Sequence, residues 1–157
     1  MHRKPDGSWD KARLPSRHVT EGPERAPHRS YYYAMGLTTR QIHQPFVGVA
    51  SCWNEAAPCN IALMRQAQAA KKGVAAAGGT PREFCTITVT DGIAMGHEGM
   101  KSSLPSREVI ADSVEIEMQT FPNCDPYGAT PPGHRRDRAS FKWTRSGTSR
   151  RSCLAGM

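Results

Sequence analysis

Two short apolar segments that flank one patterned helical run constrain the fold of this chain more than any other feature. Phe46–Ser51 (FVGVAS) is a continuous apolar run and predicts a buried strand. Residues 61–77 predict a helix that ends at Gly78 and Gly79, and residues 84–89 alternate apolar and small polar side chains like a second strand. A strand, a helix and a strand at this spacing form a βαβ unit, so we expect a parallel pair with a right-handed crossover. The predicted fold class is therefore α/β, with a partial βαβ-containing domain.

The helix over residues 61–77 has a predicted start and a predicted buried face. Asn60 is a good N-cap residue, because its side chain can accept a hydrogen bond from an unpaired N–H group of the first turn. A run of apolar positions recurs at helical spacing and should pack on the sheet. These positions are Ile61, Met64, Ala67 and Val74.

Further elements are predicted on both sides of the βαβ unit. A helix over residues 24–35 precedes it, with Gly36 placed as the C-terminal stop. Residues 90–103 form a loop at the C-terminal end of the second strand, the edge at which open α/β sheets bind ligands. A helix over residues 104–119 follows, with Pro105 in its first turn.

Composition divides the chain into three parts. Residues 1–13 carry charges of both signs without an apolar core, and we expect a flexible N-terminus. Residues 14–119 hold the α/β domain. Residues 120–157 are rich in Pro, Gly, Ser and Arg and poor in aliphatic side chains, which predicts an irregular or disordered basic tail.

The net charge of +7 is concentrated in that tail. Residues 1–119 carry 14 Lys and Arg against 12 Asp and Glu, whereas residues 120–157 carry 7 against 2. Basic tails bind polyanions nonspecifically, and no aromatic platform or zinc-finger spacing accompanies this one. We expect no specific nucleic-acid binding, and a non-catalytic polyanion-binding fragment is kept as an alternative of another functional class.

Cysteine usage and the N-terminus indicate a reducing compartment. No apolar run is long enough to span a bilayer, and the first residues lack the apolar core of a secretory signal. The five cysteines match neither a disulfide scaffold nor a zinc-binding spacing. We therefore expect no membrane association and a cytoplasmic location, or an organelle matrix in a eukaryote, with thiols able to bind a metal or cluster.

Cys59 is the first candidate ligand. It precedes the predicted helix, and the dipole and N–H groups of a helix N-terminus favour the thiolate that a metal or cluster needs. The alternative is a small buried residue in the elbow between strand and helix. Both interpretations are compatible with the residues alone.

Asp91 is the second candidate ligand, in the Gly-rich loop after the second strand. A carboxylate there is a reasonable Mg²⁺ ligand, since neighbouring glycines let the loop approach an ion closely. Asp-Gly is also an ordinary turn dipeptide. His97 and Glu98 share the loop, but a His-Glu pair by itself is a weak signal.

Five blocks of the sequence, in one order, carry a family resemblance. They are Ser16-Arg17 with Thr20 and Gly22, GVASCWNEAAPCN (residues 48–60), AAGGTPREF (76–84), TDGIAMGHEGM (90–100) and SLPSREVIADSVE (103–115). Together they resemble the N-terminal part of dihydroxy-acid dehydratase, whose family also contains phosphogluconate dehydratase and sugar-acid dehydratases. The resemblance runs from about residue 14 to residue 119. It covers only the start of the family's chain, which is several times longer.

The resemblance implies a hydro-lyase. The family removes water from a 2,3-dihydroxy carboxylic acid to give a 2-keto acid, with an iron–sulfur cluster and Mg²⁺ as cofactors. The implied substrates are the small 2,3-dihydroxy-3-methyl acids of valine and isoleucine biosynthesis, and the implied assembly of the parent enzyme is a homodimer. A sugar-acid or phosphogluconate dehydratase of the same family is the alternative.

The resemblance also assigns roles to two residues. The cysteine of the family's Pro-Cys-Asn motif matches Cys59, which implies a [2Fe–2S] cluster ligand. The aspartate of the Asp-Gly-Ile motif matches Asp91, which implies a Mg²⁺ ligand. Cys52 matches a position that is not a ligand in the family.

The sequence departs from the family after Gln119. The expected Gly-Cys-Asp-Lys-Ser block is absent, and Asn123-Cys124-Asp125 imitates it without the lysine or a preceding strand, so Cys124 and Asp125 are uncertain candidates. The family's serine base would lie beyond Met157, so no catalytic residue is assigned in this chain. We interpret the change as a truncation or a change of reading frame that leaves an unrelated tail, and we expect the chain alone to be inactive.

Overall fold

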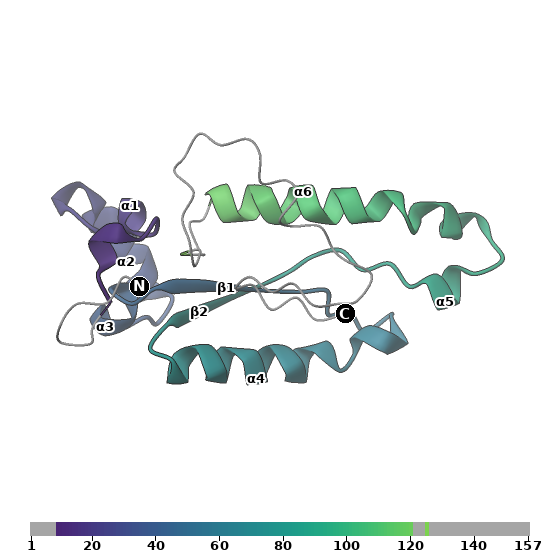
Figure 1. Cartoon of the computed structure of the whole chain (residues 1–157), viewed down its shortest axis with the longest axis horizontal. Coiled ribbons are helices and arrows are strands. Elements are labelled where there is room, and N and C mark those ends of the chain that lie inside the picture. Colours follow the sequence, from purple (N-terminus) through teal and green to yellow (C-terminus); the bar gives the residue numbers. More distant parts are fainter. Residues whose placement is uncertain (1–8, 121–124, 126–157) are drawn as a thin grey trace.

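A computed structural model of the chain describes residues 9–120 and Asp125. The predictions for residues 1–8, for Cys124 and for the rest of the tail lie outside these described residues. Two parallel strands form a small sheet, with α4 (Leu63–Ala76) on one side and α6 (Pro105–Thr120) on the other (Figure 1). Short N-terminal helices lie at one end of the sheet, and α5 (Asp91–Ala94) lies at the other. The α/β fold class is confirmed.

The first strand forms where the apolar run predicts it. β1 (Phe46–Ser51) pairs in parallel with β2 (Thr80–Cys85), and Phe46 is the partner of Thr80. Five of the six β1 residues are buried, as in strands that are covered on both faces. The predicted parallel pair is confirmed.

The second strand begins earlier than predicted. β2 starts at Thr80 and ends at Cys85, so only its last two residues fall in the predicted strand over residues 84–89. The N–H group of Thr80 donates to the carbonyl of Pro45 at 2.7 Å, and its hydroxyl donates to the carbonyl of Gln41 at 2.6 Å. These bonds fix the register directly after Gly79. Because β1 ends at Ser51, the ladder runs out before residue 86.

The central helix starts later than predicted, and Asn60 does not cap it. Its N-cap is Ala62, which makes no side-chain capping bond. Asn60 belongs to the short 3₁₀ turn η3 (Pro58–Asn60), where its side chain donates to the Cys52 carbonyl at 2.8 Å and is 3.0 Å from the Cys52 sulfur. The amide is used to hold the elbow together, so it is not free to cap α4.

The buried face of α4 agrees with the predicted one at Ala67 and differs from it at Ile61 and Met64. Leu63 and Ala67 are buried against the sheet, whereas Ile61 and Met64 are about half exposed. Ile61 lies in the turn before the helix and does not follow its periodicity. Leu63 and Ala67, four residues apart, set the face that packs on the strands.

The N-terminal region packs on the start of β1 through several short elements. These are η1 (Lys11–Arg13), α1 (Arg17–Thr20), η2 (Pro23–Arg25), α2 (Ala26–Ala34) and α3 (Thr39–Ile42). Helix α2 falls inside the predicted helix over residues 24–35, and Gly36 follows it with a φ of +84°. The Tyr32 ring meets the buried Phe46 ring edge-on at 5.4 Å. The packed region includes Lys11, which precedes the predicted boundary at residue 14.

The chain after β2 returns across the other face of the sheet. Helix α6 closely matches the helix predicted over residues 104–119, with Pro105 as its first residue. The loop predicted over residues 90–103 contains two short elements, α5 and the 3₁₀ helix η4 (Glu98–Ser102). Within residues 9–120, no helix is both long and apolar enough to cross a membrane.

Candidate functional site

The two candidate ligands lie at the same end of the sheet. β1 leads through the elbow to Cys59 in η3, and β2 leads through residues 86–90 to Asp91, the first residue of α5. Because the strands are parallel, both segments leave the sheet at its carboxyl-terminal edge (Figure 1). This is the edge at which the sequence predicts a ligand site.

The elbow between β1 and α4 is held by two buried residues. Ala57 is buried, and its carbonyl accepts a hydrogen bond from the N–H group of Asn60 at 2.9 Å. The Asn60 side chain binds back to Cys52, as described above. Cys59 lies between these anchored positions with an exposed side chain. The interpretation of Cys59 as a small buried residue is therefore wrong.

Cys59 is not placed directly at the start of α4, as the sequence predicts. It lies four residues before Leu63, in a 3₁₀ turn of three residues. A single short turn has little dipole, so the structure gives no helix-dipole reason for an activated thiolate. The exposure of Cys59 at the sheet edge still supports a ligand role.

The other described cysteines have different surroundings. Cys52 is half-buried, and burial raises the pKa of its thiol, while the Asn60 hydrogen bond acts in the opposite direction. A neutral half-buried thiol that anchors the elbow agrees with a structural role. Cys85 is exposed at the end of β2, with its sulfur 3.6 Å from the Ser51 hydroxyl. It offers a matched control for Cys59.

Asp91 presents an exposed carboxylate in the first turn of α5. The glycines around it have different surroundings. A side chain at Gly92 would meet no atom within 4 Å, so the described structure gives no steric need for glycine there. Gly96 has a φ of +86°, and a side chain at Gly99 would collide with the His97 ring. These two glycines shape the turn that follows Asp91.

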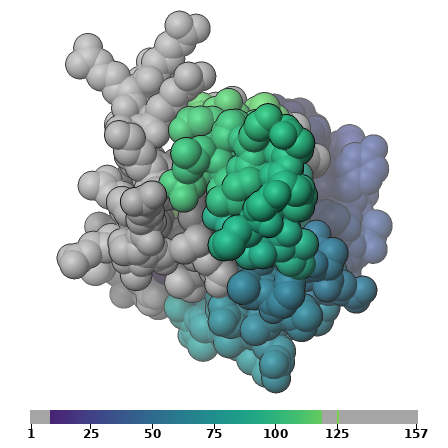
Figure 2. Space-filling view, turned by 90° about the vertical axis from the view of Figure 1, so that its right-hand side faces the viewer, coloured from purple at the N-terminus to yellow at the C-terminus, as the bar shows by residue number. Residues whose placement is uncertain are grey.

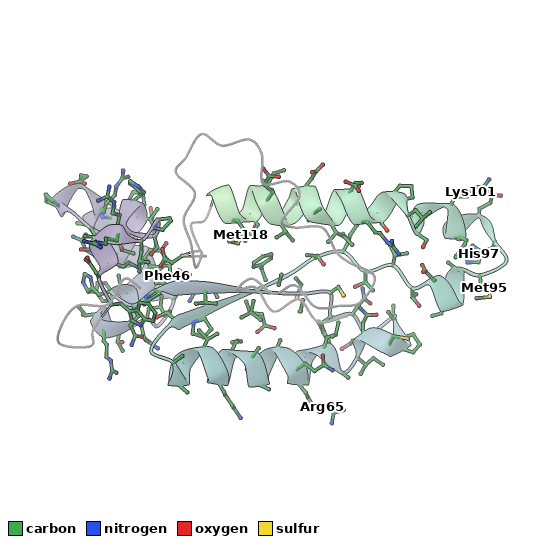
Figure 3. All side chains as sticks on the ribbon, viewed as in Figure 1. Phe46, Arg65, Met95, His97, Lys101 and Met118 are labelled. Carbon is green, nitrogen blue, oxygen red and sulfur yellow. The ribbon has the colours of Figure 1, made fainter. Side chains whose placement is uncertain are left out.

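His97 and Glu98 are used within their own loop. The Nδ1 atom of His97 accepts a hydrogen bond from the N–H group of Gly99 at 3.0 Å and so caps η4. Glu98 forms an exposed ion pair with Lys101. Both His97 and Lys101 lie at the far tip of the molecule (Figure 3). Among the described residues, no three His, Cys, Asp or Glu side chains come together to hold a metal ion.

Asp125, the uncertain site candidate, lies in a buried hydrogen-bond cluster. Its carboxylate accepts hydrogen bonds from the Ser16 N–H at 2.8 Å, the Ser16 hydroxyl at 2.5 Å and the Phe46 N–H at 2.8 Å. The Lys11 ammonium lies 3.8 Å away. The side chain is 1% exposed, and four protein donors surround it. It fastens the N-terminal segment to the start of β1.

Lys11 completes this buried cluster. Its ammonium donates to the Gln44 carbonyl at 2.8 Å and lies 4.2 Å from the centre of the Phe46 ring. Burial lowers the pKa of Lys11 to about 8, although Asp125 and Glu21 act to raise it. No pattern in the sequence predicts this cluster. Its members span residues 11 to 125, and no local pattern links them.

Comparison with known proteins shows the family to which this α/β chain belongs. The model of the N-terminal domain of dihydroxy-acid and 6-phosphogluconate dehydratases matches residues 44–125. This match covers more than half of the chain, so the chain belongs to that family. It includes both Cys59 and Asp91, and it extends past the predicted boundary at residue 119 as far as Asp125.

The curated relatives carry a more particular name. The chain is 88% identical over 109 residues to dihydroxy-acid dehydratase 2 of Bradyrhizobium diazoefficiens, which is 69% of this chain and 19% of that protein. It is 82% identical over 112 residues to dihydroxy-acid dehydratase of Parvibaculum lavamentivorans, which is 71% of this chain and 19% of the relative. The corresponding protein of Dinoroseobacter shibae is 79% identical over 112 residues. The chain thus spans about a fifth of the length of these relatives.

Proposed function

We propose that this chain is the N-terminal part of a dihydroxy-acid dehydratase, a hydro-lyase that converts 2,3-dihydroxy-3-methyl acids to 2-keto acids. The observation that carries the proposal is the 88% identity over 109 residues to a protein of that name. At such identity the two segments share a fold and most of their surface chemistry. The exposed thiol and carboxylate at the sheet edge supply donor atoms of the kinds that such a reaction site needs.

We assign Cys59 as a ligand of a [2Fe–2S] cluster and Asp91 as a ligand of Mg²⁺. Thiolate is the usual protein ligand of iron–sulfur clusters, and Mg²⁺ prefers carboxylate oxygen. Both side chains are exposed, so both are accessible to a ligand. When bound, these groups would supply Lewis-acid chemistry. Cys59 and Asp91 can each supply one ligand. Among the described residues, no three His, Cys, Asp or Glu side chains come together to complete a coordination set.

The chain's own residues would position these ligands. The Asn60 amide and the buried Ala57 hold the elbow so that the Cys59 thiol faces outward at the sheet edge. The first turn of α5 presents the Asp91 carboxylate at the same edge. A substrate bound at this edge would meet Cys59 in the elbow after β1 and Asp91 in the segment after β2.

We also propose that the 157-residue chain alone does not turn over substrate. A [2Fe–2S] cluster needs several protein ligands, and the described residues present one thiol at the proposed position. The test is anaerobic reconstitution with iron and sulfide, followed by an assay of 2-keto acid formation from 2,3-dihydroxy-3-methylbutanoate. We expect no turnover above the rate without protein, and measurable turnover would contradict this proposal.

The family function is tested in a chimera. The matched segment of the Bradyrhizobium relative is replaced by the 109 residues of this chain, and dehydration is measured. We expect activity close to that of the relative. Asp91→Asn should abolish it, whereas Asp112→Asn, at an exposed aspartate on α6, should not. An inactive but folded chimera, or equal effects of the two variants, would refute the proposal.

The family description also names 6-phosphogluconate dehydratase, which gives a second candidate substrate class. The same chimera assayed with 6-phosphogluconate distinguishes the two. We expect the smaller 2,3-dihydroxy-3-methyl acid to be preferred, because the relatives reported above are all named for dihydroxy acids. The homodimer, the cytoplasmic location and the absence of specific nucleic-acid binding stay predictions.

A further inference from the structure

One carbonyl oxygen lies where the two segments of the candidate site leave the sheet. It belongs to Cys52, the residue that follows β1. This oxygen accepts a hydrogen bond from the Asn60 side-chain amide at 2.8 Å and another from the Thr88 hydroxyl at 2.7 Å. A carbonyl oxygen has two lone pairs, so it can accept both bonds at once. In the space-filling view onto this end of the molecule, the blue surface of the elbow adjoins the green surface of the segment after β2 (Figure 2).

The two donors come from the segments that carry the proposed ligands. Asn60 directly follows Cys59 in η3. Thr88 lies three residues before Asp91, in the segment that leads from β2 to α5. The Cys52 carbonyl therefore joins the elbow of the proposed cluster ligand to the segment of the proposed Mg²⁺ ligand.

The Thr88 hydrogen bond anchors a segment that has left the sheet. β1 ends at Ser51, whose carbonyl accepts a hydrogen bond from the Thr86 N–H group at 2.8 Å. Two residues further along, the Thr88 hydroxyl reaches back to Cys52. Because the Thr88 side chain is partly shielded from water, this bond is stronger than one at the surface. It fixes the chain three residues before the exposed Asp91.

We propose that Thr88 is a positioning residue, which fixes the Asp91 carboxylate relative to the Cys59 thiol through the Cys52 carbonyl. This inference rests on the proposed function. A substrate held by two ligand-bearing segments requires them at a constant separation, and a misplacement of about 1 Å can cost about 10²-fold in rate. Because the acceptor is a main-chain oxygen, this role of Cys52 does not depend on its thiol.

The test measures metal binding without turnover. Mn²⁺ replaces Mg²⁺ as a paramagnetic probe, because both ions prefer oxygen ligands, and its binding to the chimera defined above is followed by electron paramagnetic resonance. Thr88→Val removes the hydroxyl and keeps the shape of the side chain. We expect it to weaken Mn²⁺ binding by about fivefold, the effect of losing one net hydrogen bond. The iron and sulfide content should stay unchanged, because Asn60 still holds the elbow.

Three further variants separate positioning from a general structural role. Thr88→Ser keeps the hydroxyl and should retain the Mn²⁺ affinity of the parent chimera. Thr86→Val removes a hydroxyl that contacts the adjacent Ile87 carbonyl at 3.2 Å, so it should leave the affinity unchanged. Thr88→Ala removes the hydroxyl without adding a methyl group and should weaken binding as Thr88→Val does. The alanine variant carries the comparison if the valine variant does not fold.

Other outcomes overturn the proposal. Equal Mn²⁺ affinities in Thr88→Val and Thr86→Val would show that Thr88 does not position Asp91. A loss of iron and sulfide together with Mn²⁺ in Thr88→Val would show that the hydroxyl supports the whole sheet edge instead.

Asp91→Asn distinguishes this failure from a failure of the proposed function. If Asp91→Asn binds Mn²⁺ as tightly as the parent chimera, then the ligand assignment of Asp91 is wrong, and the positioning role of Thr88 is overturned with it. If Asp91→Asn abolishes Mn²⁺ binding while Thr88→Val matches Thr86→Val, then only the positioning role is contradicted.

Discussion

The buried carboxylate of Asp125 gives the sharpest test of the fold. Asp125→Ala removes an acceptor that serves the Ser16 N–H, the Ser16 hydroxyl and the Phe46 N–H, at 2.5 to 2.8 Å. It also leaves the Lys11 ammonium, 3.8 Å away, without its counter-charge. A buried donor left unsatisfied costs about 1–3 kcal/mol. Removal of one partner of a buried ion pair costs about 3–5 kcal/mol.

We expect a loss of about 3–5 kcal/mol rather than the sum of all these costs, because the contributions overlap. Lys11 keeps its hydrogen bond to the Gln44 carbonyl, and loss of Asp125, which raises the Lys11 pKa, lets the buried amine lose its proton more readily and so reduces the penalty. Since small domains are stable by only about 5–15 kcal/mol, the variant should be clearly weakened.

The assay is urea unfolding of the 157-residue chain followed by far-ultraviolet circular dichroism. Asp112→Ala is the matched control, because Asp112 is exposed on α6 and should change stability by no more than about 0.5 kcal/mol. A double-mutant cycle with Lys11→Met isolates the coupling between the two charges. If Asp125→Ala falls within the range of Asp112→Ala, then Asp125 does not fasten the N-terminal segment to β1.

Two further predictions test the core and its charge. Leu63→Ala should cost about 2–5 kcal/mol because the side chain is buried under the sheet, whereas Met64→Ala should cost far less; equal losses in urea unfolding would contradict the observed face of α4. Burial lowers the pKa of Lys11 from 10.5 to about 8, so between pH 8 and 10 the unfolded chain binds more protons than the folded one, and stability should rise with pH by up to about 3 kcal/mol. Lys11→Met should remove this rise, and a slope that survives the substitution would assign it to another group.

Local patterns were sufficient to predict part of the fold. The apolar run of β1 and the first-turn proline of α6 place those elements correctly, because both signals lie within the element itself. The start of β2 depends on hydrogen bonds from Thr80 to Pro45 and Gln41, which come from a distant part of the chain. β2 also contains charged residues such as Glu83, which pairs with Lys71 at 2.8 Å. These residues interrupt the alternation of apolar and polar side chains by which a strand is predicted.

The candidate site, like the fold, could be predicted from the sequence only in part. The positions of Cys59 and Asp91 at the sheet edge follow from strand order and parallel pairing, which the sequence predicts. The role of Asn60 did not follow, because a residue suited to an N-cap is equally suited to bind the elbow. The Lys11–Asp125 cluster joins residues from opposite ends of the described chain, and a search along the sequence has no means of pairing them.

The central claim is that Cys59 binds an iron–sulfur cluster at the carboxyl-terminal edge of the sheet. The most direct measurement is the iron and sulfide content of the anaerobically purified chimera, compared between Cys59→Ser and Cys85→Ser. Both cysteines are exposed and both lie near this edge, so the pair differs chiefly in the proposed ligand role. We predict that Cys59→Ser loses the cluster and Cys85→Ser retains it. Full iron and sulfide content in Cys59→Ser would contradict the account.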